Sequence, residues 1–397
     1  MSTALADITV IDLTHMLSGP YAGMILADLG ATTIKVEPLA GEGTRKLLQT
    51  DPDYSLGDQG AYFITLNRNK QSVAIDLKSE QGLAVFYDLV KTADIVLDNF
   101  SAGVTQKLGI DYEQLSRVNP SIITCSISGF GSDGPSYQRT AFDQVVQALG
   151  GGMSITGLDA SMPMRAGIPI GDLGGGMFGV MGILAALHER SVNGMGQHVD
   201  ISMLDVQISM LNYMATMYFM SGKNPEPIGN SHFVHVPYNS FRASDGHLII
   251  AVIFDKFWGA LVDVLDVPAF RDPKYLTQPG RLADKDFIES TINEVLQTRT
   301  CDEWLTLLEA RRIPCARVNT LGQALADEQV LHRQMVVDLY NDRGESVKGP
   351  GNPIKLSRHT DTYAPAPALG AHTQSVLAGL GHSAEDIAAL KSAGVIA

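Results

Sequence analysis

The stretch Ile8-Thr-Val-Ile-Asp-Leu13 decides the fold, because its β-branched and apolar residues are typical of a buried strand. A helix is predicted directly after it, from Gly19 to Leu29, and Gly30 is the residue expected to end that helix. A second strand is predicted at Thr32–Val36. A strand, a helix and a strand in this order favour two parallel strands with the helix packed against their sheet.

The same alternation continues through the first half of the chain. Further strands are predicted at Ser72–Asp76, Asp94–Asp98 and Ser121–Ser126, with a helix at Ser79–Lys91. The rhythm indicates an α/β fold in which helices cover both faces of a parallel sheet. In such sheets ligands bind beyond the carboxyl ends of the strands. We therefore expect one common edge to carry three loops: Thr14–Pro20, Asn99–Phe100 and Ser128–Gly131.

The composition is that of a globular protein of two or three domains, since 45% of its 397 residues are hydrophobic and 18% are charged. The net charge of −14 makes nucleic acids and anionic membranes unfavourable partners. The three cysteines are scattered and form no Cys-x-x-Cys pair, so we expect a reducing cytoplasm. We expect neither a signal peptide nor a membrane-spanning segment.

The second half of the chain changes character. Residues Gly176 to about Ser221 are rich in methionine and are predicted to be helical, with a polar turn at Asn193–Gln197. Gly222–Pro227 has the composition of a linker. Beyond it, Phe241–Val252 is predicted to form a hairpin that turns at Ser244-Asp-Gly246, followed by helices. These residues favour a smaller α+β domain.

Asp172 is the most informative single residue. It lies alone between two apolar, glycine-rich runs, Gly167–Gly171 and Leu173–Gly176. Desolvation raises the free energy of a carboxylate, so an acid in this setting is a candidate nucleophile or base. The structural alternative is an N-cap for a buried helix over Met177–Leu187, because aspartate caps helices well. The local pattern leaves both interpretations open.

Thr14-His15 follows the first strand and precedes the first predicted helix. Free amides at that helix N-terminus suit a phosphate or a developing oxyanion, although His15 could equally be packed in a loop. The Gly-x-Gly-x-x-Gly dinucleotide pattern, the phosphate-binding Gly-x-x-x-x-Gly-Lys-Ser/Thr loop and the Gly-x-Ser-x-Gly elbow are all absent. His232 and His235 are three residues apart without a matching acid, so no metal site is expected.

Several cations follow strands of the predicted sheet. Such cations usually form a solvated face, but in an acidic protein they are also the natural counter-charge for an anionic ligand. Asp143 is a second acid in an apolar setting, and it could cap a helix or tune Asp172. The candidate cations are Asn67-Arg-Asn-Lys70, Lys78, Lys107 and Arg139.

Taken together, these residues resemble the family III CoA-transferases over essentially the whole chain. The resemblance is carried by short motifs in a fixed order and spacing. They are Asp12-Leu-Thr-His-Met-Leu-Ser-Gly-Pro20, Ala27-Asp-Leu-Gly-Ala31, Ile34-Lys-Val-Glu-Pro38, Asn67-Arg-Asn-Lys70, Asp98-Asn-Phe100, Ser128-Gly-Phe-Gly131, Gly171-Asp172, Gly194-Met-Gly-Gln197 and Leu369-Gly-Ala-His-Thr373.

The resemblance implies a large Rossmann-like domain built from both chain ends, residues 1–221 and 326–397, around a small α+β domain at 222–325. It also implies an interlocked homodimer, with two subunits threaded through each other. The implied chemistry moves CoA between carboxylic acids through an aspartyl-CoA thioester, with Asp172 at the position of the nucleophile. The amides of Gly174 to Gly176 would then donate to the oxyanion.

The resemblance also assigns ligand-binding roles to matching positions. His15 and Met16 would contact the pantetheine or the thioester. The nucleotide path would be lined by Ile75, Lys78, Asn99, Phe100 and Lys107, with Arg139 as a further phosphate ligand. A CoA thioester is thus expected as substrate, and neither a permanently bound cofactor nor a metal is expected.

Two departures from formyl-CoA transferase point away from formate and oxalate. Leu17 and Pro38 replace a glutamine and an arginine, and residues 229–241 lack that enzyme's glycine-rich run. We therefore expect a larger, dicarboxylic acceptor with succinyl-CoA as donor. The hypothesis assigns its second carboxylate to Arg165, His232 or His235.

Two alternatives stay open. An α-methylacyl-CoA racemase of the same superfamily would use a histidine in a Gly-His-Asp run, where this chain has Ala141-Phe142-Asp143. A non-catalytic acyl-CoA-binding protein would gain nothing from an acid beside the thioester, which Asp172 supplies.

Overall fold

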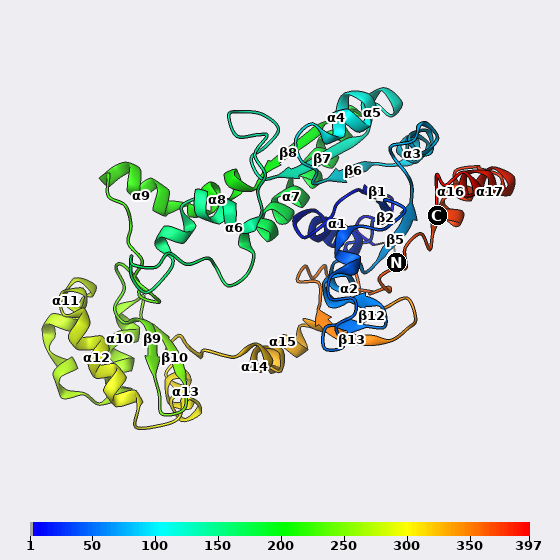
Figure 1. Ribbon diagram of the computed structural model, residues 1–397. Coiled ribbons are helices and arrows are strands. Elements are labelled where there is room, and N and C mark those ends of the chain that lie inside the picture. Colours follow the sequence, from blue (N-terminus) through cyan, green and yellow to red (C-terminus); the bar gives the residue numbers. More distant parts are fainter. Residues whose placement is uncertain (1–2) are drawn as a thin grey trace. The chain divides into compact units, whose positions relative to one another are not determined.

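The computed structural model describes residues 3–397 as two compact units (Figure 1). Unit 1 contains the residues up to Gly152, Arg165–Gly222 and Glu328–Ala397. Unit 2 contains Met153–Met164 and Lys223–Asp327, so a short segment just before Arg165 groups with the later residues.

Unit 1 is built on a six-stranded sheet in the order β5-β2-β1-β6-β7-β8, and every neighbouring pair is parallel. This confirms the expected α/β fold with a central parallel sheet. The strands are β1 (Thr9–Asp12), β2 (Thr32–Glu37), β5 (Lys70–Ala74), β6 (Ile95–Asp98), β7 (Ile123–Ser128) and β8 (His198–Ser202).

Helices cover both faces of this sheet because alternate residues of each strand point to opposite sides. On one face, Val10 of β1 is buried with residues of α1 (Ser18–Asp28) and α7 (Ile170–Asn193). On the other face, Ile11 of β1 is buried with residues of α3 (Glu80–Thr92) and of the chain end. The chain end, including α16 (Thr373–Gly379) and α17 (Ala384–Ser392), lies beside β5, where Ala397 N donates to Ala74 O at 3.2 Å.

The region from Gly176 to Ser221 differs from the prediction of helices broken only by a polar turn at Asn193–Gln197. It contains the edge strand β8 followed by α8 (Met203–Leu211) and α9 (Tyr213–Ser221). The strand was missed because its residues His198-Val-Asp-Ile-Ser202 follow a polar turn and keep one face polar. Helix α7 also begins at Ile170, seven residues before the predicted Met177, and so includes Asp172.

The glycines of α7 allow its close packing. A Cβ at Gly176 would lie 2.7 Å from Ser18 O of α1, and one at Gly179 would lie 2.9 Å from Ile127 Cδ1 of β7. By length and composition alone α7 could cross a membrane. Its buried residues instead face α1, α8 and β7 within unit 1, as in the core helix of a globular domain.

Unit 2 has its own sheet and core. Its antiparallel sheet has the order β11-β10-β9, and the predicted hairpin is formed by β9 (Tyr238–Arg242) and β10 (His247–Ala251). The other elements of this unit are α10 (Asp255–Leu265), η3 (Pro268–Arg271), η4 (Pro273–Leu276), α11 (Gln278–Ala283), α12 (Lys285–Leu296), α13 (Cys301–Ala310), β11 (Cys315–Arg317) and α14 (Leu321–Leu325).

The remaining elements are short. They are η1 (Gly43–Lys46), β3 (Ser55–Leu56), β4 (Gln59–Gly60), α2 (Ala61–Asn67), α4 (Val104–Leu108), α5 (Tyr112–Val118), α6 (Asp143–Leu149), η2 (Gly152–Ile155), α15 (Glu328–His332), β12 (Val336–Tyr340) and β13 (Ser346–Pro350).

Candidate active site

Asp172 lies in the first turn of α7, not at its N-cap as one of the two interpretations held. The cap is supplied by Asp143, the first residue of α6. Its Oδ1 accepts hydrogen bonds from Gly171 N at 2.8 Å and from Asp172 N at 3.3 Å. A cap that comes from 28 residues away cannot be found from the local sequence, which is why Asp172 itself was a candidate.

The pKa of Asp172 is raised from its ordinary value of 3.8 to about 6, first by burial and then by the charge of Asp143. At neutral pH its carboxylate is therefore mostly ionised but poorly solvated. A poorly solvated carboxylate is a stronger oxygen nucleophile than one in water.

Tyr62 of α2, which no sequence motif marks, belongs to the same site. Burial raises its pKa to about 12, with further contributions from the charges of Asp172 and Glu42. The Glu42 charge also acts on His15, whose pKa is lowered mainly by burial. Because such charge effects fall off over roughly 10 Å, these groups surround one region of unit 1.

The loops after β1 and β6 meet as predicted. His15 N donates to Asn99 Oδ1 at 3.0 Å, and Asn99 Nδ2 donates to His15 O at 2.7 Å. The ring of His15 lies 5.7 Å from that of Phe100, centroid to centroid. Met16 has a φ of 63° and is 40% exposed, so its side chain is held out from the turn.

The third predicted loop lies at the same edge. Ser128 is the last residue of β7, the neighbour of β6, and its Oγ accepts a hydrogen bond from Gly131 N at 2.9 Å. The prediction that three loops share one edge is therefore confirmed.

Buried charged side chains form hydrogen bonds and ion pairs next to this edge. Lys70 Nζ donates to Asp12 Oδ2 at 2.7 Å, and Lys35 Nζ donates to Thr14 O at 2.7 Å. Arg68 forms an equally buried ion pair with Asp28. Arg68 and Lys70 are thus already paired inside the protein, so they form neither of the two predicted arrangements, a solvated face or a counter-charge for an anionic ligand.

Two further expectations need correction. Gly174 and Gly175 lie inside α7, where each backbone amide is used by the helix, so they do not offer free donors to an oxyanion. Their absent side chains instead admit Val206 and Met203 of α8. Ile75 is 1% exposed and packs in the core beside Ile396, so its side chain cannot line a ligand path.

The cationic candidates Lys78, Lys107 and Arg139 all lie at the surface of unit 1. The Arg139 guanidinium stacks over Phe130 at 5.1 Å from the ring centroid. Lys107 lies in the last turn of α4 and Lys78 precedes α3. Their assignment to the CoA phosphates stays a prediction.

A groove of about 800 Å³ lies over the polar face of β6, β7 and β8. Phe100 lines it, which connects it to the loop after β6. Burial raises the pKa of Asp98 to about 6, while Ser126 Oγ donates to its carboxylate at 2.6 Å. His198 and Asp200 also line the groove, and they were not candidates because β8, which carries them, was not predicted.

The candidates for a second substrate carboxylate divide between the units. Arg165 in unit 1 is exposed and donates to Ala166 O and Gly167 O. His232 and His235 are in unit 2. His232 Nδ1 accepts from Val234 N at 3.0 Å and from His235 N at 3.1 Å, so the neutral ring carries its proton on Nε2.

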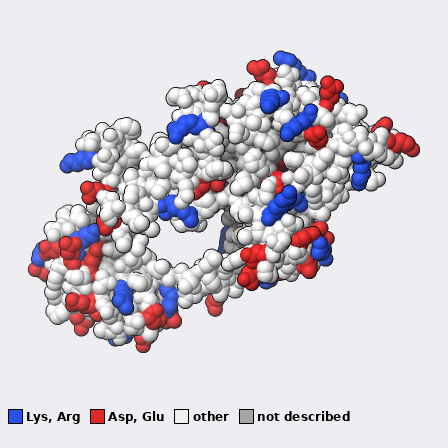
Figure 2. All heavy atoms as spheres, in the orientation of Figure 1, with Lys and Arg blue, Asp and Glu red and all other residues white. Residues whose placement is uncertain are grey.

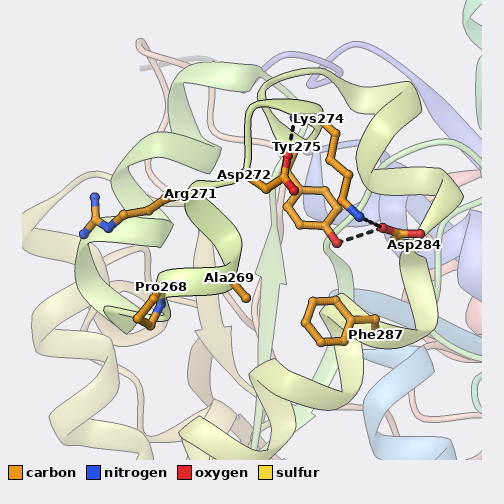
Figure 3. A pocket seen from close by; sticks show the side chains of 8 residues that line it. All are labelled: Pro268, Ala269, Arg271, Asp272, Lys274, Tyr275, Asp284 and Phe287. Carbon is orange, nitrogen blue, oxygen red and sulfur yellow. Dashed lines mark hydrogen bonds and ion pairs between the residues drawn. The ribbon is translucent and has the colours of Figure 1, made fainter.

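Unit 2 also has an open depression of about 710 Å³ (Figure 3). Three of the side chains drawn there bind one another, because Asp284 accepts from Lys274 Nζ at 2.6 Å and from the Tyr275 hydroxyl at 2.8 Å. Among residues 3–397 no group of three histidine, cysteine or acidic side chains is arranged to hold a metal ion.

The loops of the α/β sheet thus gather at its carboxyl edge, and a largely buried carboxylate lies in the first turn of α7, which packs against that sheet. The chain belongs to CoA-transferase family III, whose model matches residues 5–373.

Relatives agree with this membership. The chain is 38% identical to succinate–glutarate CoA-transferase from Agrobacterium fabrum over 95% of both chains. It is 36% identical to acetyl-CoA:oxalate CoA-transferase from Acetobacter aceti over 89% of both. The fold matches a CAIB/BAIF family protein from Brucella suis with a TM-score of 0.86 and 33% identity, covering 96% of this chain and 100% of that one.

Proposed function

We propose that this enzyme moves CoA from succinyl-CoA to a small dicarboxylic acid, with Asp172 as the covalent nucleophile. The observation that carries the proposal is the desolvated Asp172 carboxylate, with its pKa raised to about 6 at the start of α7. The relatives support the substrate class, since their names pair CoA transfer with succinate and glutarate or with oxalate.

The proposed reaction alternates between thioesters and mixed anhydrides. An Asp172 oxygen attacks the thioester carbonyl of the donor, and CoA leaves as a thiolate from the resulting mixed anhydride. The thiolate attacks the Asp172 carbonyl, which releases the donor acid and leaves an aspartyl-CoA thioester. The acceptor carboxylate then attacks the aspartyl-CoA thioester, which releases the CoA thiolate and forms a second mixed anhydride. The thiolate attacks the acceptor's carbonyl in that anhydride, which yields the new acyl-CoA and the free Asp172 carboxylate.

The loop residues have matching roles in this proposal. His15 and Met16 would meet the thioester end of CoA, while Phe100 offers an apolar wall beside them. Lys78, Lys107 and Arg139 supply surface cations for the phosphates. Of the two histidines we favour His232 as the donor to the acceptor's second carboxylate, because the two backbone bonds to its Nδ1 leave the proton on Nε2.

We also propose that the enzyme works as a homodimer, interlocked as the resemblance implies, in the cytoplasm. The exposed residues of α7 to α9 support self-association, since they include large apolar side chains, and the face of α9 that is visible in Figure 2 is mostly uncharged. These side chains include Met177, Met181, Leu184, Met210, Met217 and Phe219. Three unpaired cysteines agree with a reducing compartment.

The decisive experiment traps the covalent intermediate. The enzyme is incubated with succinyl-CoA, treated with borohydride or hydroxylamine, and mapped by mass spectrometry. We expect modification at Asp172 and none in Asp172→Asn, which should also lose transferase activity. Asp205→Asn is the matched control, because Asp205 holds the same third position in α8 but is exposed. Full activity of Asp172→Asn would remove the proposal.

A panel of donors and acceptors defines the substrates. Succinyl-CoA and acetyl-CoA are tested against glutarate, oxalate and monocarboxylic acids of similar length. We expect the succinyl and longer dicarboxylic pair to be preferred. The same reactions in deuterated water test the racemase alternative, which requires exchange of the α-proton and a base where the chain has Phe142.

A further inference from the structure

Gln147 is a buried amide that neither the resemblance nor the local sequence singled out. It lies on α6 one turn after Asp143 and is 2% exposed. Its Nε2 donates to Asp143 Oδ2 at 2.7 Å, and its Oε1 accepts from Ala166 N at 2.9 Å. Because a carboxylate can only accept and a backbone N–H can only donate, these partners fix the orientation of the amide.

The two carboxylate oxygens of Asp143 accept hydrogen bonds from different groups. Oδ2 is held by Gln147, while Oδ1 holds the amides of Gly171 and Asp172. Ala166, the other partner of Gln147, is the second residue after the Met153–Met164 segment that groups with unit 2. The Gln147 side chain thus links the segment that leads into α7 with Asp143, whose carboxylate caps α7.

We propose that Gln147 is a positioning residue, which fixes the direction of the Asp172 carboxylate by holding Asp143 and Ala166 in one hydrogen-bonded assembly. The inference rests on the proposed role of Asp172 as nucleophile. Attack on a thioester requires the carboxylate oxygen to be aimed within a narrow range, and a shift of about 1 Å can lower a rate by 100-fold.

Only a neutral amide of this length satisfies both partners. A leucine would leave Asp143 Oδ2 and Ala166 N without their bonds. A glutamate would keep an acceptor for Ala166 N but could not donate to Asp143, and it would add a negative charge beside it. The ionisable groups around Asp172 are Asp143 on α6 and Tyr62 on α2, with Glu42 acting on Tyr62. A further negative charge among them should favour the protonated form of Asp172.

The test compares Gln147→Leu and Gln147→Glu with the intact enzyme, using the donor and acceptor pair from the panel. We expect Gln147→Leu to lower kcat about 10-fold or more, while KM for the acyl-CoA changes less than about threefold. We expect Gln147→Glu to move the acid limb of the kcat profile upward by about 0.5 to 1 pH unit.

Gln207→Leu is the matched control. Gln207 is a buried glutamine of the neighbouring α8, and its side-chain nitrogen has no hydrogen-bond partner among the described residues. Its replacement should leave kcat and the acid limb unchanged. Thermal unfolding of each variant shows whether the protein remains folded at the assay temperature.

The outcomes separate this inference from the proposed function. If both Gln147 variants are folded and keep the kcat and acid limb of the intact enzyme, Gln147 has only a structural role and the inference is overturned. If Gln207→Leu loses as much kcat as Gln147→Leu, the loss reflects core disruption and the inference is also overturned. Retained activity in Asp172→Asn would instead overturn the proposed nucleophile, independently of Gln147.

Discussion

Replacing Asp172 by asparagine should make the protein more stable at neutral pH while removing its activity. Burial and the neighbouring Asp143 raise the pKa of Asp172 from 3.8 to about 6, so the fold works against its ionised form. Each pKa unit corresponds to about 1.4 kcal/mol, which gives about 3 kcal/mol as the upper limit. Because solvent reaches part of the side chain, we expect a gain of about 1 to 2 kcal/mol.

The sign of this effect depends on pH. Above pH 6 the intact protein carries the full cost of the ionised carboxylate, whereas below pH 3.8 the group is protonated in both the folded and the unfolded chain. The stability of Asp172→Asn should therefore exceed that of the intact protein at pH 7.5, and the difference should shrink between these two values. Thermal or denaturant unfolding across this range measures it directly.

Asp205→Asn is again the control, since an exposed acid in the first turn of a helix interacts favourably with the helix dipole. Its replacement should be neutral or slightly destabilising at pH 7.5. The reasoning is refuted if Asp172→Asn is no more stable than the intact protein at pH 7.5, or if its advantage is the same at pH 4.

Three further predictions concern the surroundings of Asp172. Asp143→Asn removes a negative charge, so the acid limb of the profile of kcat/KM against pH should move to lower pH by about 0.5 to 1 unit. An upward shift would contradict the repulsion between Asp143 and Asp172. Lys70→Met leaves Asp12 buried without the cation it pairs with, so the free energy of unfolding in denaturant should fall by about 3 to 5 kcal/mol. A fall of less than about 1 kcal/mol would mean that water reaches Asp12. Gly176→Ala places a Cβ against the α1 backbone and should cost about 1 to 3 kcal/mol, and an unchanged unfolding midpoint would show that α1 and α7 can separate without penalty.

The sheet and its functional edge followed from the sequence because their causes are local. β-branched and apolar residues are concentrated in short runs such as Ile8–Leu13 and Thr32–Val36, and a helix between two strands favours their parallel pairing. The carboxyl ends of neighbouring strands must then meet, which brought His15 and Asn99 together in the prediction and in the structure.

The pairing of charges could not be predicted, since it depends on distant partners. Lys70 and Asp12 are 58 residues apart, and nothing in either local sequence shows that one neutralises the other. Tyr62 and Gln147 were missed for the same reason, because Tyr62 interacts with Asp172 and Gln147 with Ala166, both far away in the sequence. The glycines after Asp172 suggested a backbone open to ligand, but helix packing explains them equally well.

Burial is the main reason why the pKa of Asp172 is raised, and the cap of α7 explains why the helix start does not lower that pKa again. A carboxylate in the first turn of a helix is stabilised by about 0.3 to 1 kcal/mol through the helix dipole and the free amides. Here the free amides of Gly171 and Asp172 are taken by Asp143, so the charge that they stabilise belongs to the cap. The same carboxylate repels the ionised form of Asp172. A second acid at the helix start therefore removes a stabilisation and adds a repulsion, and both changes leave Asp172 more reactive.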